Sequence, residues 1–269
     1  MRYTPVKQRL SLFFNQHTWL RLLFYRFLDL LLLRAWYIHR ALKEWGHNKR
    51  NKSLHILDAG AGFGQYAYFL ANMSSRWNVL AVDMKSDYVC SCNRFFHKNN
   101  KQNILYRKED LRSFVVPNNF DLILSVDVVE QIKEDEQVLE NFYQSLKKGG
   151  LALLSVPSDK GGSGVHKDGD TCFCDEQIRS GYNIEEMKNK LKKIGFKKVE
   201  GQYTYGKPGS LSWKLSMKYP MMLLGISRFF FPILPLYYIL VYPFCFVLNI
   251  FDLNREHAEG TGILIKAYK

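Results

Sequence analysis

The chain is poor in cysteine and carries an odd number, five. Two C-x-C pairs and a single residue in an apolar run account for all of them: Cys90 with Cys92, Cys172 with Cys174, and Cys245. This spacing is less typical of a zinc site than C-x₂-C. We therefore expect no bound metal and reduced thiols, with a zinc site or a disulfide as the less favoured alternatives.

An uninterrupted apolar stretch followed by a cleavage site is missing at the N-terminus, which argues against a secreted protein. Internal repeats and low-complexity tracts are also missing. With 269 residues, of which 47% are hydrophobic, the chain can form one large α/β domain with additions. We expect this domain to be cytoplasmic, where thiols stay reduced.

Acidic residues are scarce relative to basic ones, and the net charge is +13. The imbalance is concentrated in residues 1–52, which hold eleven Lys or Arg against two acidic residues. A basic surface favours an anionic partner, which is either a nucleic acid or a membrane surface.

A glycine-rich stretch, residues 58–64, follows the apolar run 54–57 and precedes the helical pattern 65–71. Glycine tolerates positive φ and lets the backbone approach a ligand, and the helix start offers unpaired N–H groups. Asp83 ends the next apolar run, where a carboxylate can bind both hydroxyls of a ribose. These features predict a nucleotide-type cofactor. The alternative is a tight turn between a strand and a helix that binds no ligand.

The glycine spacing separates two cofactor classes. A dinucleotide fingerprint is G-x-G-x-x-G, whereas this chain has G-x-G-x-G followed by Gln65. Asp58, just before the glycines, would repel a pyrophosphate but would receive an ammonium group. The arrangement resembles the class I S-adenosylmethionine (SAM)-dependent methyltransferases.

Further segments extend the resemblance over roughly residues 53–207 and the final strand. They are Asp110-Leu111 after a strand at 103–106, a strand at 120–125, a motif at 126–132, a helix at 134–146 and a strand at 151–156. The motif ends in Glu-Gln where the family usually has Glu-His, so no base is expected at Gln131. The resemblance implies a Rossmann-like seven-stranded α/β sheet of order 3-2-1-4-5-7-6 with one antiparallel strand.

The resemblance also implies the cofactor, SAM, with S-adenosylhomocysteine as product, and its binding residues. These are Asp58, Gly60, Gly62 and Gly64 around the amino-acid end, Asp83 at the ribose, Met84, Asp110 and Leu111 at the adenine, and the Ser125 backbone at the ammonium.

Acceptor and catalytic residues are predicted from their places in the chain. Tyr66, Arg179, Tyr182 and Tyr205 are candidates for the acceptor pocket. His166, in the polar loop 159–170, and Asp127 are candidate bases, because a base is needed when the acceptor must lose a proton. Glu130 is expected to cap the following helix.

We expect residues 1–50 to form a basic N-terminal extension to the methyltransferase domain that the resemblance implies at 51–269. Its segment from Thr18 to Trp45 predicts one long helix whose inward stripe is Phe13, Leu20, Phe24, Phe27, Leu31, Ala35, Ile38 and Leu42. The other faces mix apolar residues with Arg21, Arg26, Arg34 and Arg40, which suits a lipid headgroup interface. A helix buried on several sides, or a dimer seam, is the alternative.

An apolar helical insertion, residues 208–253, separates the last two strands, 196–205 and 260–268. Residues 229–251 carry no charge, a length that could span a membrane. Pro232, Pro235 and Pro243 are expected to interrupt any single helix. Because both flanking strands belong to one sheet, we expect a bent hairpin that dips into one leaflet or covers an apolar substrate. An internal cap over the sheet is the alternative.

The leading hypothesis is a SAM-dependent methyltransferase acting on a hydrophobic or lipid-like small molecule at the inner face of the cytoplasmic membrane. The acceptor would be a quinone or isoprenoid head, a polyene or a lipid head group. The charge also fits an RNA methyltransferase, but the Asn/Asp-Pro-Pro-Tyr type of motif is missing after Ser125, and we expect no nucleic-acid partner. A non-catalytic SAM-binding, membrane-docked scaffold is a further alternative, but it should carry a damaged cofactor motif, and the motif is intact here. The glycine spacing disfavours a dehydrogenase.

Overall fold

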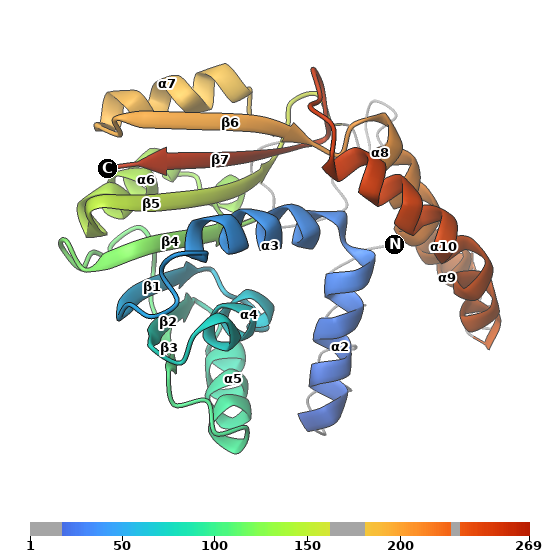
Figure 1. The fold of residues 1–269 in the computed structure, drawn as a ribbon, viewed down its shortest axis with the longest axis horizontal. Helices are drawn as coiled ribbons and strands as arrows, with labels where there is room; N and C mark the ends of the chain where they lie inside the picture. The colour runs from blue at the N-terminus through green and yellow to red at the C-terminus, as the bar shows by residue number, and fades with distance from the viewer. Residues whose placement is uncertain (1–17, 162–180, 227–231) are drawn as a thin grey trace.

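A seven-stranded sheet forms the centre of the molecule (Figure 1). The computed structural model describes residues 18–161, 181–226 and 232–269. The strand order is β3-β2-β1-β4-β5-β7-β6, and β7 runs antiparallel to both of its neighbours. The expected order and the single antiparallel strand are confirmed.

The central strands β1, β4 and β5 are buried on both faces over most of their length, so they read as nearly continuous apolar runs. Ile56 and Leu57 of β1, for example, belong to two separate core clusters on opposite faces of the sheet. The strands are β1 Leu54–Ala59, β2 Trp77–Asp83, β3 Ile104–Lys108, β4 Phe120–Val126, β5 Leu146–Pro157, β6 Lys198–Thr204 and β7 Gly262–Tyr268.

Helices cover the two faces of the sheet. The cluster on one face includes residues of α4 (Gln65–Met73), α5 (Ser86–Lys98) and the N-terminal helices, and the cluster on the other includes residues of α6 (Asp135–Ser145) and α7 (Ile184–Ile194). A 3₁₀ turn, Val129–Gln131, precedes α6. The glycine-rich turn follows β1 and the 3₁₀ turn follows β4, so both turns lie at the edge where the parallel strands end.

The N-terminal segment is two helices, α2 (Thr18–Leu31) and α3 (Leu33–Gly46), so the expectation of one long helix was wrong. Leu32 between them is extended, with φ −93° and ψ 105°. The α3 helix buries Ala35 and Ile38 in the core, whereas α2 turns away and buries Arg21 near α5. One straight helix could not make both sets of contacts.

The inward stripe predicted for this segment holds in α3 and only in part in α2, where Phe24 packs against the core while partly exposed. Ala35, Ile38 and Leu42 are buried as expected, but Phe27 of α2 is exposed. Phe13 lies outside the described residues. Arg21 is also buried rather than at a surface, because its guanidinium hydrogen-bonds to protein groups.

The insertion is a helical hairpin. It leaves β6 through α8 (Lys207–Trp213), a π-helical segment (Lys214–Lys218) and α9 (Tyr219–Ile226), and it returns through α10 (Leu234–Leu253). Contrary to expectation, the prolines do not interrupt α10. Pro235 is in its first turn, where no N–H is needed, and the helix continues through Pro243. The hydroxyls of Tyr237 and Tyr238 donate to carbonyls of the π-helical segment, at 2.7 and 2.8 Å.

A buried carboxylate, Asp252 at the end of α10, fixes the base of the hairpin. It accepts hydrogen bonds from the Tyr37 hydroxyl of α3 and the Gly209 N–H of α8, each at 2.8 Å. His257 lies 3.3 Å from the same carboxylate. Asp252 thereby joins three helices. Its loss would leave the buried Gly209 N–H without an acceptor and would remove one of the two acceptors of the Tyr37 hydroxyl.

We expect Asp252→Ala to lower the free energy of unfolding by about 3 kcal/mol, because buried polar partners lose their acceptor. Thermal and urea unfolding would measure this. The exposed Glu256→Ala is the matched control and should change stability by less than about 0.5 kcal/mol. Equal stabilities of the two variants would show that Asp252 does not hold the hairpin.

Candidate active site

The turn between β1 and α4 has the backbone that its glycines predict. Gly60, Gly62 and Gly64 have φ of 76°, 51° and 85°, a region that side chains other than glycine rarely adopt. A Cβ on Gly60 would lie 2.3 Å from Val128, and one on Gly64 would lie 2.6 Å from the Tyr106 hydroxyl. The turn therefore requires glycine for its conformation and for its close packing.

Asp83 at the end of β2 holds this turn. Its Oδ2 accepts from the Gly62 N–H at 2.9 Å, and its Oδ1 accepts from the Lys85 N–H at 2.8 Å. Each carboxylate oxygen has two lone pairs, so both can accept another hydrogen bond. The carboxylate is oriented by the backbone and still has capacity for the two ribose hydroxyls.

Asp58 at the end of β1 tests whether the site fits SAM. Its side chain is 2% exposed, and its Oδ2 has no hydrogen-bond partner within the described residues. Burial raises the pKa of Asp58 to about 7, with a smaller contribution from Asp83. A buried carboxylate without a cation is costly, and an ammonium group is the partner it requires. The residues present therefore fit SAM.

The other predicted cofactor residues lie along the same edge. Met84 is 56% exposed, and Ser125 of β4 is buried beside Ala59 of β1. Asp110 is bound by Arg112 at 2.6 Å, which lowers the pKa of its carboxyl, and Leu111 packs in the core. Met84 is therefore available to an adenine ring, while Asp110 would share its carboxylate between Arg112 and a ligand.

Asp127 stands after β4 in a strained conformation, with φ of 52°. Its N–H donates to Ser155, and its carbonyl accepts from the Gln131 side chain at 2.7 Å. Gln131 therefore maintains the backbone turn at Asp127. The Asp127 carboxylate forms an ion pair with Arg34 of α3. Strained residues held in this way are often found at active sites.

Two tyrosines surround Arg34. The Tyr205 hydroxyl accepts from the Arg34 backbone N–H at 2.9 Å, and Tyr205 has φ of 56°. Tyr66 is buried in the first turn of α4, and its pKa is raised by burial while the Arg34 charge opposes the shift. Tyr66, Tyr205 and Asp127, all predicted site residues, are thus brought together by an arginine that was expected to face lipid headgroups.

Glu130 does not cap α6, contrary to expectation. Its side chain is fully buried, neither carboxyl oxygen has a hydrogen-bond partner in the described structure, and no side-chain capping bond is present at α6. Burial raises the pKa of Glu130 to about 7, and Arg34 opposes the shift. The sequence analysis did not assign Glu130 or Arg34 to the site. For Glu130, the one available signal was its place in the Glu-Gln ending of the motif.

Of the remaining candidates, only Tyr182 is among the described residues, and it lies elsewhere. Tyr182 donates to Asp135 of α6 at 3.0 Å and packs in the cluster on the opposite face of the sheet, so the structure does not bring it to Tyr66 and Tyr205. His166 and Arg179 lie outside the described residues. Within the described ranges, no group of three His, Cys, Asp or Glu could hold a metal ion.

Comparison with known proteins supports a methyltransferase domain. Residues 56–150 match the model of a methyltransferase domain family. The ubiquinone biosynthesis O-methyltransferase of Rickettsia akari is 26% identical over 41% of this chain and 43% of its own length. The phosphoethanolamine N-methyltransferase 2 of Caenorhabditis elegans is 24% identical over 60% of this chain and 36% of its own length. The chain thus matches less than half of each of these curated relatives.

Solved structures share the fold. The phosphoethanolamine N-methyltransferase 2 of Haemonchus contortus in complex with SAM aligns with a TM-score of 0.62, 19% identity, 87% of this chain and 52% of that one. The [4+2]-cyclase SpnF aligns with a TM-score of 0.57 and 13% identity over 86% of this chain and 80% of that one. One fold therefore accompanies more than one activity.

The sheet order, the glycine-rich turn and the matched segment define a class I SAM-dependent methyltransferase domain. Its cofactor is SAM.

We expect SAM affinity to depend on pH through Asp58. Below about pH 7, the site loses affinity as the free carboxyl holds a proton. Above about pH 8, a free α-amino group loses its own proton. Affinity should therefore peak between these values, as measured by calorimetric titration of SAM across pH.

Asp58→Asn should remove the acidic limb of this profile and weaken SAM binding more than tenfold near pH 7.5. The folded-state pKa of Asp58 is raised above its ordinary value of 3.8, so the wild-type fold loses stability as pH rises through about 7. The variant should consequently unfold at a higher temperature at pH 8 without SAM. An unchanged pH profile would show that Asp58 does not meet the ammonium.

Proposed function

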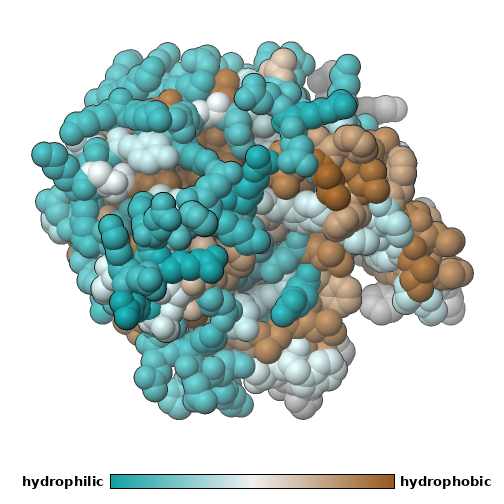
Figure 2. Space-filling model, in the orientation of Figure 1, coloured by the Kyte–Doolittle hydropathy of each residue, from teal (hydrophilic) through white to brown (hydrophobic). Residues whose placement is uncertain are grey.

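We propose that this protein transfers a methyl group from SAM to a hydrophobic or lipid-like small-molecule acceptor at the cytoplasmic membrane surface. The observation that carries the proposal is the apolar outer surface of the helical hairpin beside the cofactor edge. In Figure 2, brown residues gather over α8–α10 and the lower part of α2, whereas the left side of the same view is mainly hydrophilic.

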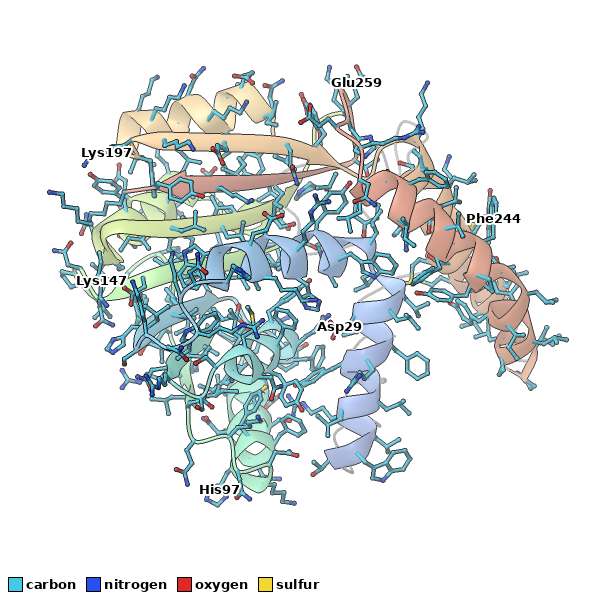
Figure 3. The ribbon with its side chains drawn as sticks, in the orientation of Figure 1. Asp29, His97, Lys147, Lys197, Phe244 and Glu259 are labelled. Atoms are coloured by element: carbon cyan, nitrogen blue, oxygen red, sulfur yellow. The ribbon has the colours of Figure 1, made fainter. Side chains whose placement is uncertain are left out.

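The hairpin exposes large apolar side chains. Ile239 and Leu240 are 70% and 71% exposed, and Phe244 projects outward from α10 in Figure 3. The others are Leu211, Tyr219, Met222, Ile233, Leu236, Phe246, Val247, Ile250 and Phe251. Exposed apolar surface on this scale indicates a lipid, membrane or protein partner.

α10 is long and apolar enough to cross a membrane by length and composition, and 11% of its apolar window is buried in the protein. Both ends of the hairpin, however, join neighbouring strands β6 and β7 of one sheet. The chain must enter and leave on the same side. We therefore propose insertion into one leaflet rather than a span.

The comparisons support a small acceptor. The matched relatives are named for ubiquinone biosynthesis, for malonyl-[acyl-carrier protein] and for phosphoethanolamine. Among these, a quinone-type or lipid-type acceptor agrees best with the exposed apolar hairpin. Its reactive head would lie at Arg34 and the tyrosines, and its apolar tail would remain in lipid.

SAM supplies an electrophilic methyl group, and the protein must position the acceptor for in-line displacement and exclude water. Tyr66 and Tyr205 would orient the acceptor head. Asp127 or Glu130 would take a proton from an acceptor hydroxyl or amine. Both carboxyl groups lie close to Arg34, where we place the acceptor head. Glu130 is well suited to this role because a carboxyl with a pKa of about 7 both accepts and releases a proton at neutral pH.

The direct test is transfer of labelled methyl from SAM into a total cell extract, separated into organic-soluble, nucleic-acid and protein fractions. We expect label in the organic phase, where mass spectrometry can identify the product. Glu130→Gln and Asp127→Asn should each reduce the label at least tenfold, because proton removal typically contributes about 10²-fold or more. Label in nucleic acid would refute the proposed acceptor.

The membrane part is tested separately by vesicle co-sedimentation. We expect the protein to bind vesicles of phosphatidylcholine and phosphatidylglycerol, and the double variant Ile239→Ser with Leu240→Ser to bind at least tenfold more weakly. The matched control is Leu105→Ser, which removes an equally large apolar side chain from exposed β3. Equal binding by both variants and the wild type would contradict docking through the hairpin.

A further inference from the structure

The helix α2 has two opposite faces of different chemistry. One face is buried and contains Arg21 and Tyr25, which are one helical turn apart. The other is an exposed apolar stripe, Trp19, Leu23, Phe27 and Leu30, with exposed fractions from 41% to 63%. At 100° per residue, the stripe is on the opposite side of the helix from Arg21 and Tyr25.

The buried face holds the glycine-rich turn. The Arg21 guanidinium donates to the Phe63 carbonyl at 2.8 Å, and the Tyr25 hydroxyl donates to the same carbonyl. Arg21 also donates to Tyr25 at 2.8 Å and lies over the Phe95 ring, 4.6 Å from its centroid. Phe63 lies between Gly62 and Gly64, so these bonds fix the backbone that meets the cofactor.

A second contact reinforces the first. Asp29, near the end of α2, accepts from the side chain of Gln65 at 2.6 Å, and Gln65 is the first residue of α4. Figure 3 shows Asp29 on the inner side of α2, toward α4. The glycine turn is therefore held by α2 at Phe63 and immediately after its last glycine.

The exposed stripe is continuous with the hairpin surface. The Tyr242 hydroxyl of α10 donates to the Leu30 carbonyl at 2.8 Å, and Trp36 of α3 packs against Phe246 of α10 with ring centroids 5.1 Å apart. A partner that covers the hairpin would therefore reach the end of α2 as well.

A lipid surface fits this stripe better than a second copy of the chain. Each copy carries a net charge of +13, so two copies repel, whereas an anionic bilayer attracts the protein. Arg26 is exposed on α2, close in sequence to the stripe, and Trp19 is of the residue type found at membrane interfaces. An interfacial helix with an aromatic and aliphatic face matches this composition.

We propose that α2 couples the lipid surface to the cofactor site: the bilayer binds its outer stripe, and its Arg21–Tyr25 pair then holds the glycine-rich turn in the SAM-binding conformation. This inference rests on membrane association, as proposed above. Arg21 and Tyr25 are positioning residues, because they act on the turn and not on the reacting atoms.

The coupling is thermodynamic, so it is reciprocal. If vesicles strengthen SAM binding by a given factor, SAM must strengthen vesicle binding by the same factor. Couplings of this kind are typically about fivefold or larger. Both directions can be measured without knowing the acceptor.

The experiment is calorimetric titration of SAM with and without saturating vesicles of phosphatidylcholine and phosphatidylglycerol, alongside co-sedimentation with and without SAM. For the wild type, we expect vesicles to strengthen SAM binding about fivefold or more. The double variant Leu23→Ser with Phe27→Ser should keep the vesicle-free SAM affinity and lose the enhancement. The matched control, Ile239→Ser with Leu240→Ser, should need more lipid but retain the enhancement at saturation.

Tyr25→Phe separates positioning from folding. It should weaken SAM binding several-fold and reduce the vesicle effect, whereas a purely structural role would lower the unfolding temperature and leave the vesicle effect unchanged. Vesicle binding by the wild type without any change in SAM affinity would overturn this inference and leave the proposed function intact. Failure of the wild type to bind vesicles would overturn both.

Discussion

The backbone of the turn between β1 and α4 is the constraint on which the rest of the site depends. Three positive-φ glycines leave its N–H and C=O groups without the shielding of side chains, so other elements must fix them. Asp83 binds the Gly62 N–H, and Arg21 and Tyr25 bind the Phe63 carbonyl. A turn that must stay open to a ligand is thus held from its outer side by α2.

Two buried carboxyls show how stability is exchanged for function. One oxygen of Asp58 and both oxygens of Glu130 have no hydrogen-bond partner in the described structure, and burial raises the pKa of each residue to about 7. Both destabilise the folded state when ionised, since water no longer solvates them. The first is suited to a cationic ligand and the second to proton transfer, so the energetic cost is found where binding and chemistry require it.

The hairpin separates polar from apolar groups. Its polar network is internal, with Asp252 at the base and tyrosine hydroxyls bonded to the π-helical carbonyls, while its outer surface is apolar. Because the internal contacts satisfy these buried polar groups, the outer face is left free for a lipid partner. In the membrane-bound state that we propose, this arrangement would keep the acceptor site and the lipid surface on one side of the sheet.

The sequence by itself indicated the strands, the glycine turn and the roles open to Asp58 and Asp83, because local periodicity, turn chemistry and strand-end carboxylates are all short-range signals. The sheet order was expected only from the resemblance to a known family. Only the tertiary structure divided the N-terminal helix at Leu32, carried α10 through Pro243 and moved Tyr182 to the opposite face. It also placed Arg34 beside Asp127 and Glu130. These outcomes depend on which surfaces pack together over long sequence separations, and helical spacing cannot distinguish an arginine that faces solvent from one that enters a site.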